Sequence, residues 1–479
     1  MNLTRDEEGC LEWFIHRTST KLSGAFVSNK ATTLLLQASS TEPAVLHAVL
    51  ALSSAHREVI DDHSYRALLD SSYQELLTVR QYNKAIGNLQ PHFLSQSKAS
   101  TCVTLVACII FVHLEFLRGK YTIGMKHLQH GLNLLQDADL AIAKEHGGST
   151  GSTSSLENWV VTILRRILIP VKLMGQTVQI PHNQILSGEP VPKVPFVSVH
   201  QARRSLESLI VRILRLSERC TYRNGTPELS CDDQQLVQSD LRQWTLIHRT
   251  TTEHLPRTTN LSERSAYRLL ELYHLMATIM AVVQIGCNQE TAYDRHTVDF
   301  VTIISHCIQS YKFACEYHGL EPARVLSTEQ PGSRALPNMG WITPLYYTAV
   351  KCRNHRIRLH AIKLLELMPH REGIWDASQA AVIARKVVAI EEQDFYKDID
   401  IVNDFDLLSA PNTQELLLPV LPEDHRLNAI NLVLPDDPTS KLVLRCTRRA
   451  GLEKTLWKYD LGSRTWSDFS CEIEVGSCS

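Results

Sequence analysis

Residues 341–392 read WITPLYYTAVKCRNHRIRLHAIKLLELMPHREGIWDASQAAVIARKVVAIEE and carry a long helical pattern. Thr343 followed by Pro344 predicts a helix start, because threonine caps helices and proline in the first turn lacks only an N–H that the helix does not use. Apolar residues then recur at helical spacing until Pro369, which is expected to end the helix. This apolar stripe comprises Tyr346, Val350, Ile357, Ala361, Leu364 and Met368.

A second helix is predicted after the turn HREG, residues 370–373. Asp376, with Gln379 three residues later, has the spacing of a capping box, and the apolar residues that follow face one side of the helix. The polar residues of the first helix fall into two rows. We therefore predict a helical hairpin with a basic outer face, whose rows are Lys351, His355 and Arg358, and Arg356, His360 and Lys363.

Arg353 lies seven residues after Tyr346, on the apolar stripe of its own helix. An unpaired buried guanidinium is costly, so this side chain must reach water or meet a carboxylate. We expect an acidic partner, with Glu372 or Asp376 the leading candidates. The alternative is a contact to an effector or to a DNA phosphate.

Two earlier segments complete a recognisable order. Thr41–Glu58 (TEPAVLHAVLALSSAHRE) predicts a helix capped by Thr41, and Phe111–Leu135 contains an E-x-x-x-G…H-x-x-x-G-x-x-L pattern that ends in Leu134. Together with residues 341–392, they cover most of residues 40–395 and resemble the fungal-specific transcription factor domain. The residues that carry the signature, which we expect to be mostly structural, are Glu115, Gly119, His127, Gly131, Pro344, Cys352, Arg353, Arg356, Arg371, Glu372, Gly373, Trp375 and Asp376.

The composition of the 479 residues is that of an ordered globular protein, with 44% hydrophobic and 21% charged residues. A net charge of −2 gives no general attraction for nucleic acid. The twelve cysteines are scattered, which indicates reduced thiols in an intracellular protein. The apolar run Leu105–Val112 is too short to span a bilayer, so it predicts a buried core helix and no membrane association.

The predicted fold class is all-α, a large array of helical hairpins with solenoid-like packing and a small C-terminal antiparallel β appendage. From Leu427 the pattern changes to short β-rich runs separated by turns. The expected divisions are an N-terminal helical part (1–146), a Gly/Ser linker (147–155), the main helical part (156–424) and a β-rich cap (425–479).

The resemblance implies a Zn2Cys6 DNA-binding module ahead of such a domain, but no two cysteines here have the C-x2-C spacing that this module needs. Two Cys/His groups are candidate metal sites: His306, Cys307, Cys315 and His318, and the pair His127 and His130. Cys307 and Cys315 are too far apart along a helix to share one metal, and the histidine pair lacks an obvious third donor. We expect no metal and no cofactor.

Enzyme signatures are weak. G-x-S-x-G occurs around Ser149, but inside the Gly/Ser tract and without the preceding strand that would expose a nucleophile. The pairs Asp61-Asp62 and Asp232-Asp233 lack the further acid of an aspartate-rich metal motif and fit helix N-termini instead. We expect no enzyme.

The acidic tract Glu391–Leu408 interleaves acids with aromatic and aliphatic residues. It has the composition of an activation segment that docks on coactivators, although a helix end that runs into a solvated acidic loop is the simpler interpretation.

The resemblance implies a nuclear transcriptional regulator that acts through protein partners, either a DNA-bound transcription factor or a coactivator, with no direct nucleic-acid binding. Its targets would be metabolic or secondary-metabolite genes, and both a homodimer and a heterodimer stay open. The alternatives are a cytoplasmic interaction scaffold, an enzyme of unrecognised helical type, and a fragment of a zinc-cluster activator whose upstream exon is missing.

Overall fold

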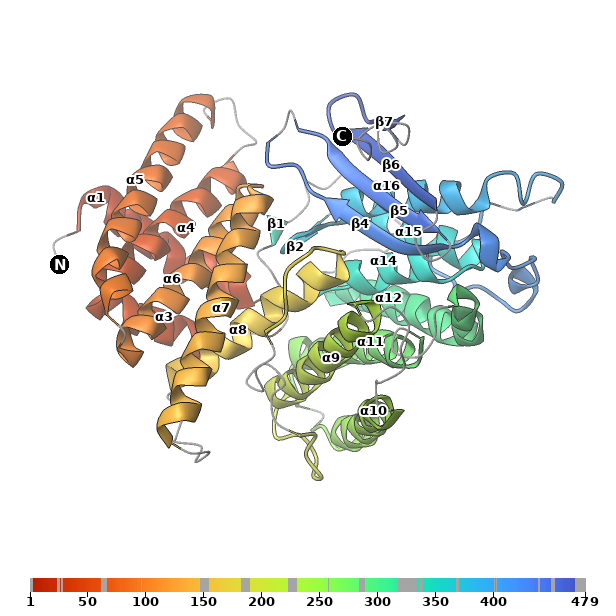
Figure 1. Cartoon of the computed structure of the whole chain (residues 1–479), viewed down its shortest axis with the longest axis horizontal. Coiled ribbons are helices and arrows are strands. Elements are labelled where there is room, and N and C mark those ends of the chain that lie inside the picture. The colour runs from red at the N-terminus through yellow and green to blue at the C-terminus, as the bar shows by residue number, and fades with distance from the viewer. Residues whose placement is uncertain are drawn as a thin grey trace.

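The first half of the chain forms helices that pack pairwise in the computed structural model (Figure 1). The structure describes residues 3–469 except 24–25, 27–28, 62–66, 96, 147–154, 182–189, 223–230, 257, 284–288, 318–333, 336–338, 368–369, 400, 402, 438–439 and 449–452. The elements of this half are α1 (Arg5–Trp13), the π-helix η1 (Phe14–Thr18), α2 (Ser19–Ser23), α3 (Asn29–Thr41), α4 (Pro43–Asp61), α5 (Ala67–Leu94), α6 (Lys98–Leu117), α7 (Tyr121–His146) and α8 (Ser155–Leu173).

The second half continues the helical array and ends at a sheet. Its helices are α9 (Val199–Tyr222), α10 (Cys231–Glu253), α11 (Leu261–Val283), η3 (Glu290–His296), α12 (Thr297–Tyr317), α14 (Ile342–Lys351), α15 (His355–Leu367), α16 (Ala377–Glu392), η4 (Gln414–Leu416) and η5 (Glu423–His425). One cluster of buried apolar side chains extends from Phe14 to Tyr459 and joins the two halves.

The strands form two sheets. The smaller sheet has the strand order β1 (Arg334–Ala335), β2 (Arg371–Glu372) and β3 (Trp375–Asp376). The larger one is antiparallel, in the order β4 (Leu427–Val433), β5 (Leu442–Arg448), β6 (Glu453–Asp460) and β7 (Thr465–Asp468). This confirms the predicted all-α array with a C-terminal antiparallel appendage.

A hydrogen bond and a cation–π contact hold the larger sheet against α16. The Arg448 guanidinium donates to the Ile390 carbonyl over 3.0 Å. The Lys386 ammonium lies 3.1 Å from the centroid of the Trp457 ring, a cation–π contact between helix and sheet.

Helix α6 contains the predicted buried run and is a core helix. Ser97 caps it, accepting from the Ser100 N–H, and Leu105–Val112 are buried throughout. By length and composition α6 and α11 are each long and apolar enough to cross a membrane, but 83% and 61% of their apolar windows are buried inside the protein.

Two predicted helix starts are wrong. Thr41 belongs to the end of α3, where its hydroxyl donates back to the Ala38 carbonyl over 3.2 Å, and α4 begins instead at Pro43. Thr343 lies inside α14, whose N-cap position is Trp341. Proline in the first turn marks both starts correctly, because that turn has no use for the missing N–H. Asn260 and Asp376 do cap their helices, accepting from the N–H groups of Glu263 and Gln379.

The continuous helix predicted from residue 343 to Met368 is also wrong. It breaks at Cys352–Asn354, where Cys352 is extended (φ −73°, ψ 135°). Asn354 starts the chain again, because its side-chain oxygen accepts from the Ile357 N–H at 3.3 Å, as an N-cap does. This break turns Arg353 away from the stripe on which periodicity placed it.

Some predictions lie outside the described residues. They include residues 147–154 of the linker, with Ser149, as well as Asp62 and His318. Asp232 and Asp233 occupy the first turn of α10, as predicted. The same prediction is wrong for Asp61, which is the last residue of α4.

Candidate functional site

Three of the six residues of the predicted basic outer face are buried. Arg356, Arg358 and His360 are 4%, 0% and 0% exposed, while Lys351, His355 and Lys363 are half-buried. The chain that follows α16 covers two of the buried three: Arg356 pairs with Glu415 at 3.1 Å, and His360 Nε2 lies 3.0 Å from the Leu407 carbonyl oxygen. Periodicity located the polar rows correctly but could not show that a later segment packs over them.

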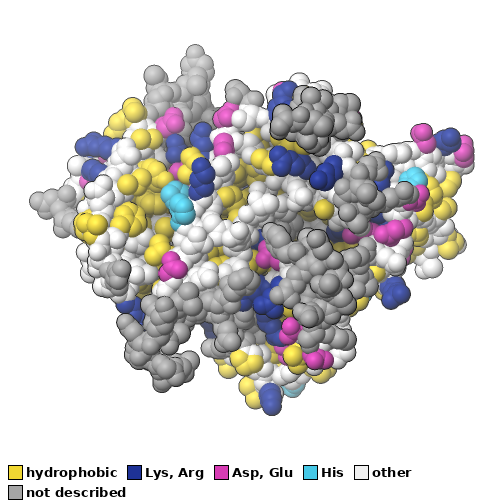
Figure 2. Space-filling model, viewed as in Figure 1, with side chains coloured by type: hydrophobic (Ala, Val, Ile, Leu, Met, Phe, Trp, Pro, Cys, Tyr) yellow, Lys and Arg dark blue, Asp and Glu magenta, His cyan; other side chains and the backbone are white. Residues whose placement is uncertain are grey.

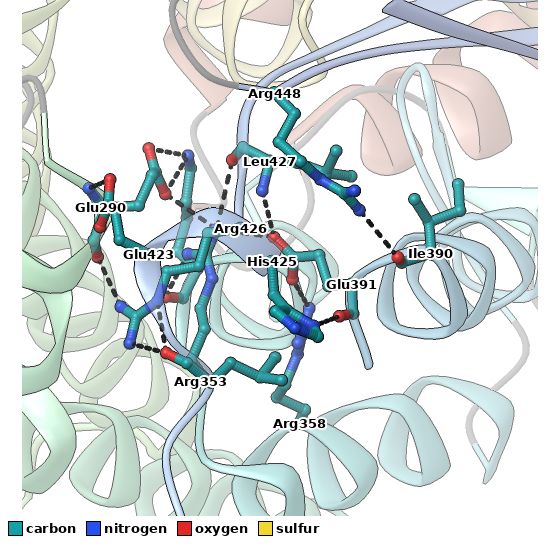
Figure 3. Close-up of polar contacts among 12 residues, drawn as sticks. Glu290, Arg353, Arg358, Ile390, Glu391, Glu423, His425, Arg426, Leu427 and Arg448 are labelled. Atoms are coloured by element: carbon teal, nitrogen blue, oxygen red, sulfur yellow. Dashed lines mark hydrogen bonds and ion pairs between the residues drawn. The ribbon is translucent and has the colours of Figure 1, made fainter. Parts of the chain in front are cut away.

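A single carboxylate, that of Glu391, joins the hairpin to the sheet (Figure 3). One of its oxygens lies 2.9 Å from Arg353 Nη2, and the other lies 2.5 Å from Arg358 Nη2. The Leu427 N–H donates to the first oxygen over 2.7 Å. Glu391, at the end of α16, thereby ties together the α14–α15 break and the first residue of β4.

A second carboxylate, Glu290 of η3, approaches Arg353 from the other side. The distance from Arg353 Nη2 to Glu290 Oε2 is 2.8 Å, and Lys351 Nζ lies 3.0 Å from Glu290 Oε1. The acidic partner predicted for Arg353 is therefore confirmed, but the two candidates, Glu372 and Asp376, are wrong. They lie at the opposite end of α16 from Glu391.

Arg426 extends the network beside η3. Its two terminal nitrogens bind the two oxygens of Asp294 at 2.9 and 2.8 Å, and it also donates to the carbonyls of Glu290 and Leu421. A bidentate arginine–carboxylate pair fixes orientation as well as charge. The chain between η5 and β4 is thus held against η3.

The charges of this cluster balance. Burial alone raises the pKa of Glu391, but Arg353 and Arg358 overcome that effect and lower it to about 2. Burial lowers the pKa of Lys351, yet Glu290 brings it above its ordinary value. Arg353 is 1% exposed and already paired, so in this structure it is not presented to a DNA phosphate or an effector. The members of this buried charge network are Lys351, Arg353, Arg358 and Arg426 against Glu290, Asp294, Glu391 and Glu392.

The turn HREGIWD organises the other end of the hairpin. Glu372 accepts from the Ile342 N–H at 3.2 Å and so caps α14, while Asp376 caps α16. Gly373 has φ +65° at the first position of the two-residue β2–β3 turn, where glycine fits without strain. The Trp375 indole donates to the Pro170 carbonyl of α8 at 3.2 Å, and Arg371 pairs with Asp376 at 2.9 Å.

The signature residues Glu115 and Gly119 lie at the C-terminal end of α6. Gly119 has φ +73°; its N–H donates to the Phe116 carbonyl, and the Lys120 N–H donates to the Glu115 carbonyl. These two bonds form a Schellman motif, which accounts for the glycine four residues after Glu115.

The signature residues His127 and Gly131 lie in α7. His127 Nε2 is 2.9 Å from the Tyr82 hydroxyl, and burial lowers its pKa to about 4. A side chain on Gly131 would meet Leu164 of α8 and Cys108 of α6 at 3.6 and 3.7 Å. Gly131 therefore marks the close approach of three helices.

Comparison with known proteins settles the class. The family model described as fungal specific transcription factor domain matches residues 10–387. The chain belongs to this family. It is 23% identical over 465 residues to the aspercryptin biosynthesis cluster-specific transcription regulator atnN of Emericella nidulans, covering 82% of this chain and 74% of that protein.

A second relative is the transcription regulator lscL of Purpureocillium lilacinum, 35% identical over 106 residues, which are 22% of this chain and 25% of that protein. No solved structure matches the chain. The fungal-specific transcription factor domain and its named relatives are regulators rather than enzymes, so this chain is a transcription regulator with a nuclear role.

Of the remaining signature positions, Pro344 and Cys352 lie at α14 and Glu115 lies in α6. Pro344 is in the first turn of α14, and Cys352 is 2% exposed at the α14–α15 break, where burial raises the thiol pKa to about 11. Glu115 is 2% exposed, and burial raises its pKa. Cys307 and Cys315, two of the candidate metal ligands, are buried in α12. That the signature is mostly structural stays a prediction.

The acidic tract of the domain is less solvated at its start than expected. Glu391 and Glu392 are buried in the charge network, and the Tyr396 hydroxyl donates to the Pro419 carbonyl at 2.7 Å. Phe405 packs under the Arg356 guanidinium, 3.3 Å from the ring centroid. The tract therefore covers α15 with its aromatic side chains.

Sequence reasoning missed Glu290, Asp294 and Arg426 entirely. They lie more than 50 residues from Arg353 along the chain and carry no local motif. Glu391 lies in the stretch 341–392 that carries the resemblance, but nothing in its spacing linked it to Arg353.

Proposed function

We propose that this chain regulates transcription through protein partners, docking on a DNA-bound factor or a coactivator. The observation that carries the proposal is the family match over residues 10–387, together with a relative that is named as a cluster-specific transcription regulator and aligns with 82% of the chain. Arg353 and Arg358 of the hairpin are neutralised inside the chain by the buried charge network, so they are not presented to a nucleic-acid phosphate, which agrees with a role through protein partners.

The charge network also suggests how the domain keeps one shape. It joins η3, the hairpin and β4, three segments distant in sequence. Each buried charge in it would be costly without its partner from another segment. A partner would then meet a fixed surface rather than a loose C-terminal sheet.

The target genes we propose are those of a secondary-metabolite pathway. The support is the printed name of the relative atnN, which is specific for the aspercryptin biosynthesis cluster.

A tethering assay tests the role in transcription. The chain is fused to an unrelated DNA-binding module and expressed beside a reporter that carries that module's sites; we expect reporter expression to change relative to the module alone. A fluorescent fusion of the untethered chain should accumulate in the nucleus. An unchanged reporter with a cytoplasmic signal would support the scaffold alternative instead.

Gene deletion in the source fungus tests the target class. Transcript sequencing should show a coordinated change in one group of neighbouring biosynthetic genes. A diffuse change in primary-metabolism genes would contradict the secondary-metabolite assignment while leaving the regulator role intact.

A further inference from the structure

The outer face of α5 carries an unusual share of exposed apolar surface. Six of the seventeen large apolar side chains that are exposed among the described residues belong to this one helix. Figure 2 shows apolar side chains gathered on the part of the surface where Figure 1 places the N-terminal helices. The six are Tyr73 (49% exposed), Leu76 (70%), Val79 (39%), Ile86 (39%), Phe93 (62%) and Leu94 (90%).

The spacing on this face is that of a coiled coil rather than of scattered residues. Four of these apolar residues and two exposed polar ones, Asn83 and Gln90, recur in steps of three, four, three, four and three, the alternation of heptad a and d positions. We name this stripe the α5 seam: Leu76, Val79, Asn83, Ile86, Gln90 and Phe93.

The inner face of the same helix is already occupied. Leu77, Gln81, Ala85 and Leu89 are buried against the rest of the domain. The α5 seam is therefore a second apolar face on a helix that the fold already holds in place, and a partner would not have to fold it.

The charges beside the seam are self-complementary. Glu75 precedes the first a position (heptad g), and Arg80 follows the next d position (heptad e); both are exposed, and within its own chain Glu75 has only a long contact, 3.8 Å, to Arg118 among the ion pairs of the described residues. In a parallel pair of helices a g residue meets the e residue five positions later on the other chain. Glu75 of each copy would therefore face Arg80 of the other, on both sides of the seam.

Asn83 sits at an a position between Val79 and Ile86. A single asparagine at an a position fixes register and favours pairs, because it bonds only when it meets its counterpart. With the two charge pairs, this favours an identical helix as the occupant over an unrelated one.

We propose that a second copy of this chain docks on the α5 seam, forming a parallel, two-fold symmetric homodimer. The seam from Leu76 to Phe93 is about 25 Å long. Such a short contact with two polar positions predicts a modest affinity, with a dissociation constant on the order of micromolar. The pairing does not depend on the proposed role in transcription.

Light scattering and sedimentation of the purified full chain test the pairing. The mass should rise with concentration toward twice the 54.2 kDa of one chain. The double variant Leu76→Glu, Ile86→Glu should weaken association on the order of 100-fold or more, because it buries charges in the seam. The matched control is Leu236→Glu, Leu246→Glu, which changes two exposed leucines of α10 and should leave association unchanged.

Circular dichroism and thermal melting show whether the seam variant still folds, as exposed positions predict. A chain that stays monomeric up to about 100 times the expected dissociation constant overturns the proposal and leaves the seam to a different protein. A dimer that survives Leu76→Glu, Ile86→Glu overturns it as well, since another face must then hold the copies together.

Cysteine cross-linking tests the parallel direction. Gln90→Cys should form a disulfide with its counterpart under mild oxidation, because residue 90 meets itself only in a parallel pair; an antiparallel pair places it opposite the other end of the seam. Thr250→Cys, exposed on α10, is the control and should give no dimer band. A seam-dependent dimer without this cross-link contradicts the parallel arrangement.

Charge exchange tests the register. Glu75→Arg alone should weaken the dimer roughly 2- to 10-fold through like-charge contact with Arg80 of the other copy. Adding Arg80→Glu in the same chain should restore the affinity, whereas a merely local effect of either change would add to the loss.

Discussion

The signature hairpin and helix α5 depart from the usual placement of side chains in opposite ways. The hairpin buries Arg353 and Arg358 completely, while α5 leaves Leu76 and Phe93 more than half exposed. The buried arginines pair with carboxylates of their own chain, whereas among the described residues the apolar side chains on the outer face of α5 stay exposed. We infer from this difference that the ion pairs of the hairpin form within one copy of the chain, whereas the outer face of α5 binds a second copy.

Removing one member of the buried charge network should have the largest effect. Arg353→Ala leaves Glu391 and Glu290 without their shared cation, and breaking a buried pair in this way lowers the free energy of unfolding by about 3–5 kcal/mol. Urea unfolding followed by circular dichroism measures it.

The matched control for Arg353→Ala is Arg385→Ala. Arg385 pairs with Glu366 on the surface, where the two side chains are 47% and 41% exposed. An exposed pair contributes only about 0–1 kcal/mol. If Arg353→Ala left the melting temperature unchanged, the structural role of the network would be lost.

His360 makes the stability of the buried hairpin depend on pH. Burial lowers its pKa to about 4, and its Nδ1 accepts from Arg356, so a proton there would face a guanidinium. Between pH 6.5 and 4 the unfolded chain binds a proton at this residue and the folded chain does not. Stability must therefore fall as the pH falls through this window, by at most about 3 kcal/mol for this one group.

Substitution isolates that contribution. His360→Gln removes the titrating group, so the variant should lose less stability than the wild type between pH 6.5 and pH 4. Parallel slopes for wild type and His360→Gln in urea unfolding would contradict the assigned burial effect.

Local patterns in the sequence predicted the helical hairpin, the Asp376 cap and an acidic partner for Arg353, because each depends on residues close together or on a general cost of burial. The break at Cys352–Asn354 was missed, since Asn354 is a capping residue in a stretch whose apolar periodicity runs through it. The network partners were missed for another reason. Glu290 reaches Arg353, and Arg426 reaches Asp294 and the Glu290 carbonyl, only when η3 and the chain before β4 are already in place.

Replacing glycine by alanine at two positions should change the free energy of unfolding by smaller amounts and in opposite directions. Gly119 and Gly87 both have open space where a side chain would begin, but only Gly119 has a left-handed φ, +73°. Gly119→Ala should lower the free energy of unfolding by about 1–2 kcal/mol through backbone strain alone. Gly87→Ala, inside α5, should raise it by about 0.5–1 kcal/mol. Equal effects in urea unfolding would mean that the Schellman turn does not constrain residue 119.

The smallest effect separates folding from association. Leu76 is 70% exposed in one copy, so Leu76→Gln should change the stability of dilute, monomeric protein by less than about 0.5 kcal/mol. At concentrations well above the dissociation constant the wild type gains stability by mass action, and the variant should gain much less. Thermal melting at low and at high protein concentration measures the stability of the monomer and the gain from association. A large loss for the dilute variant would show that Leu76 packs within its own chain, and the contrast between the hairpin and α5 would then disappear.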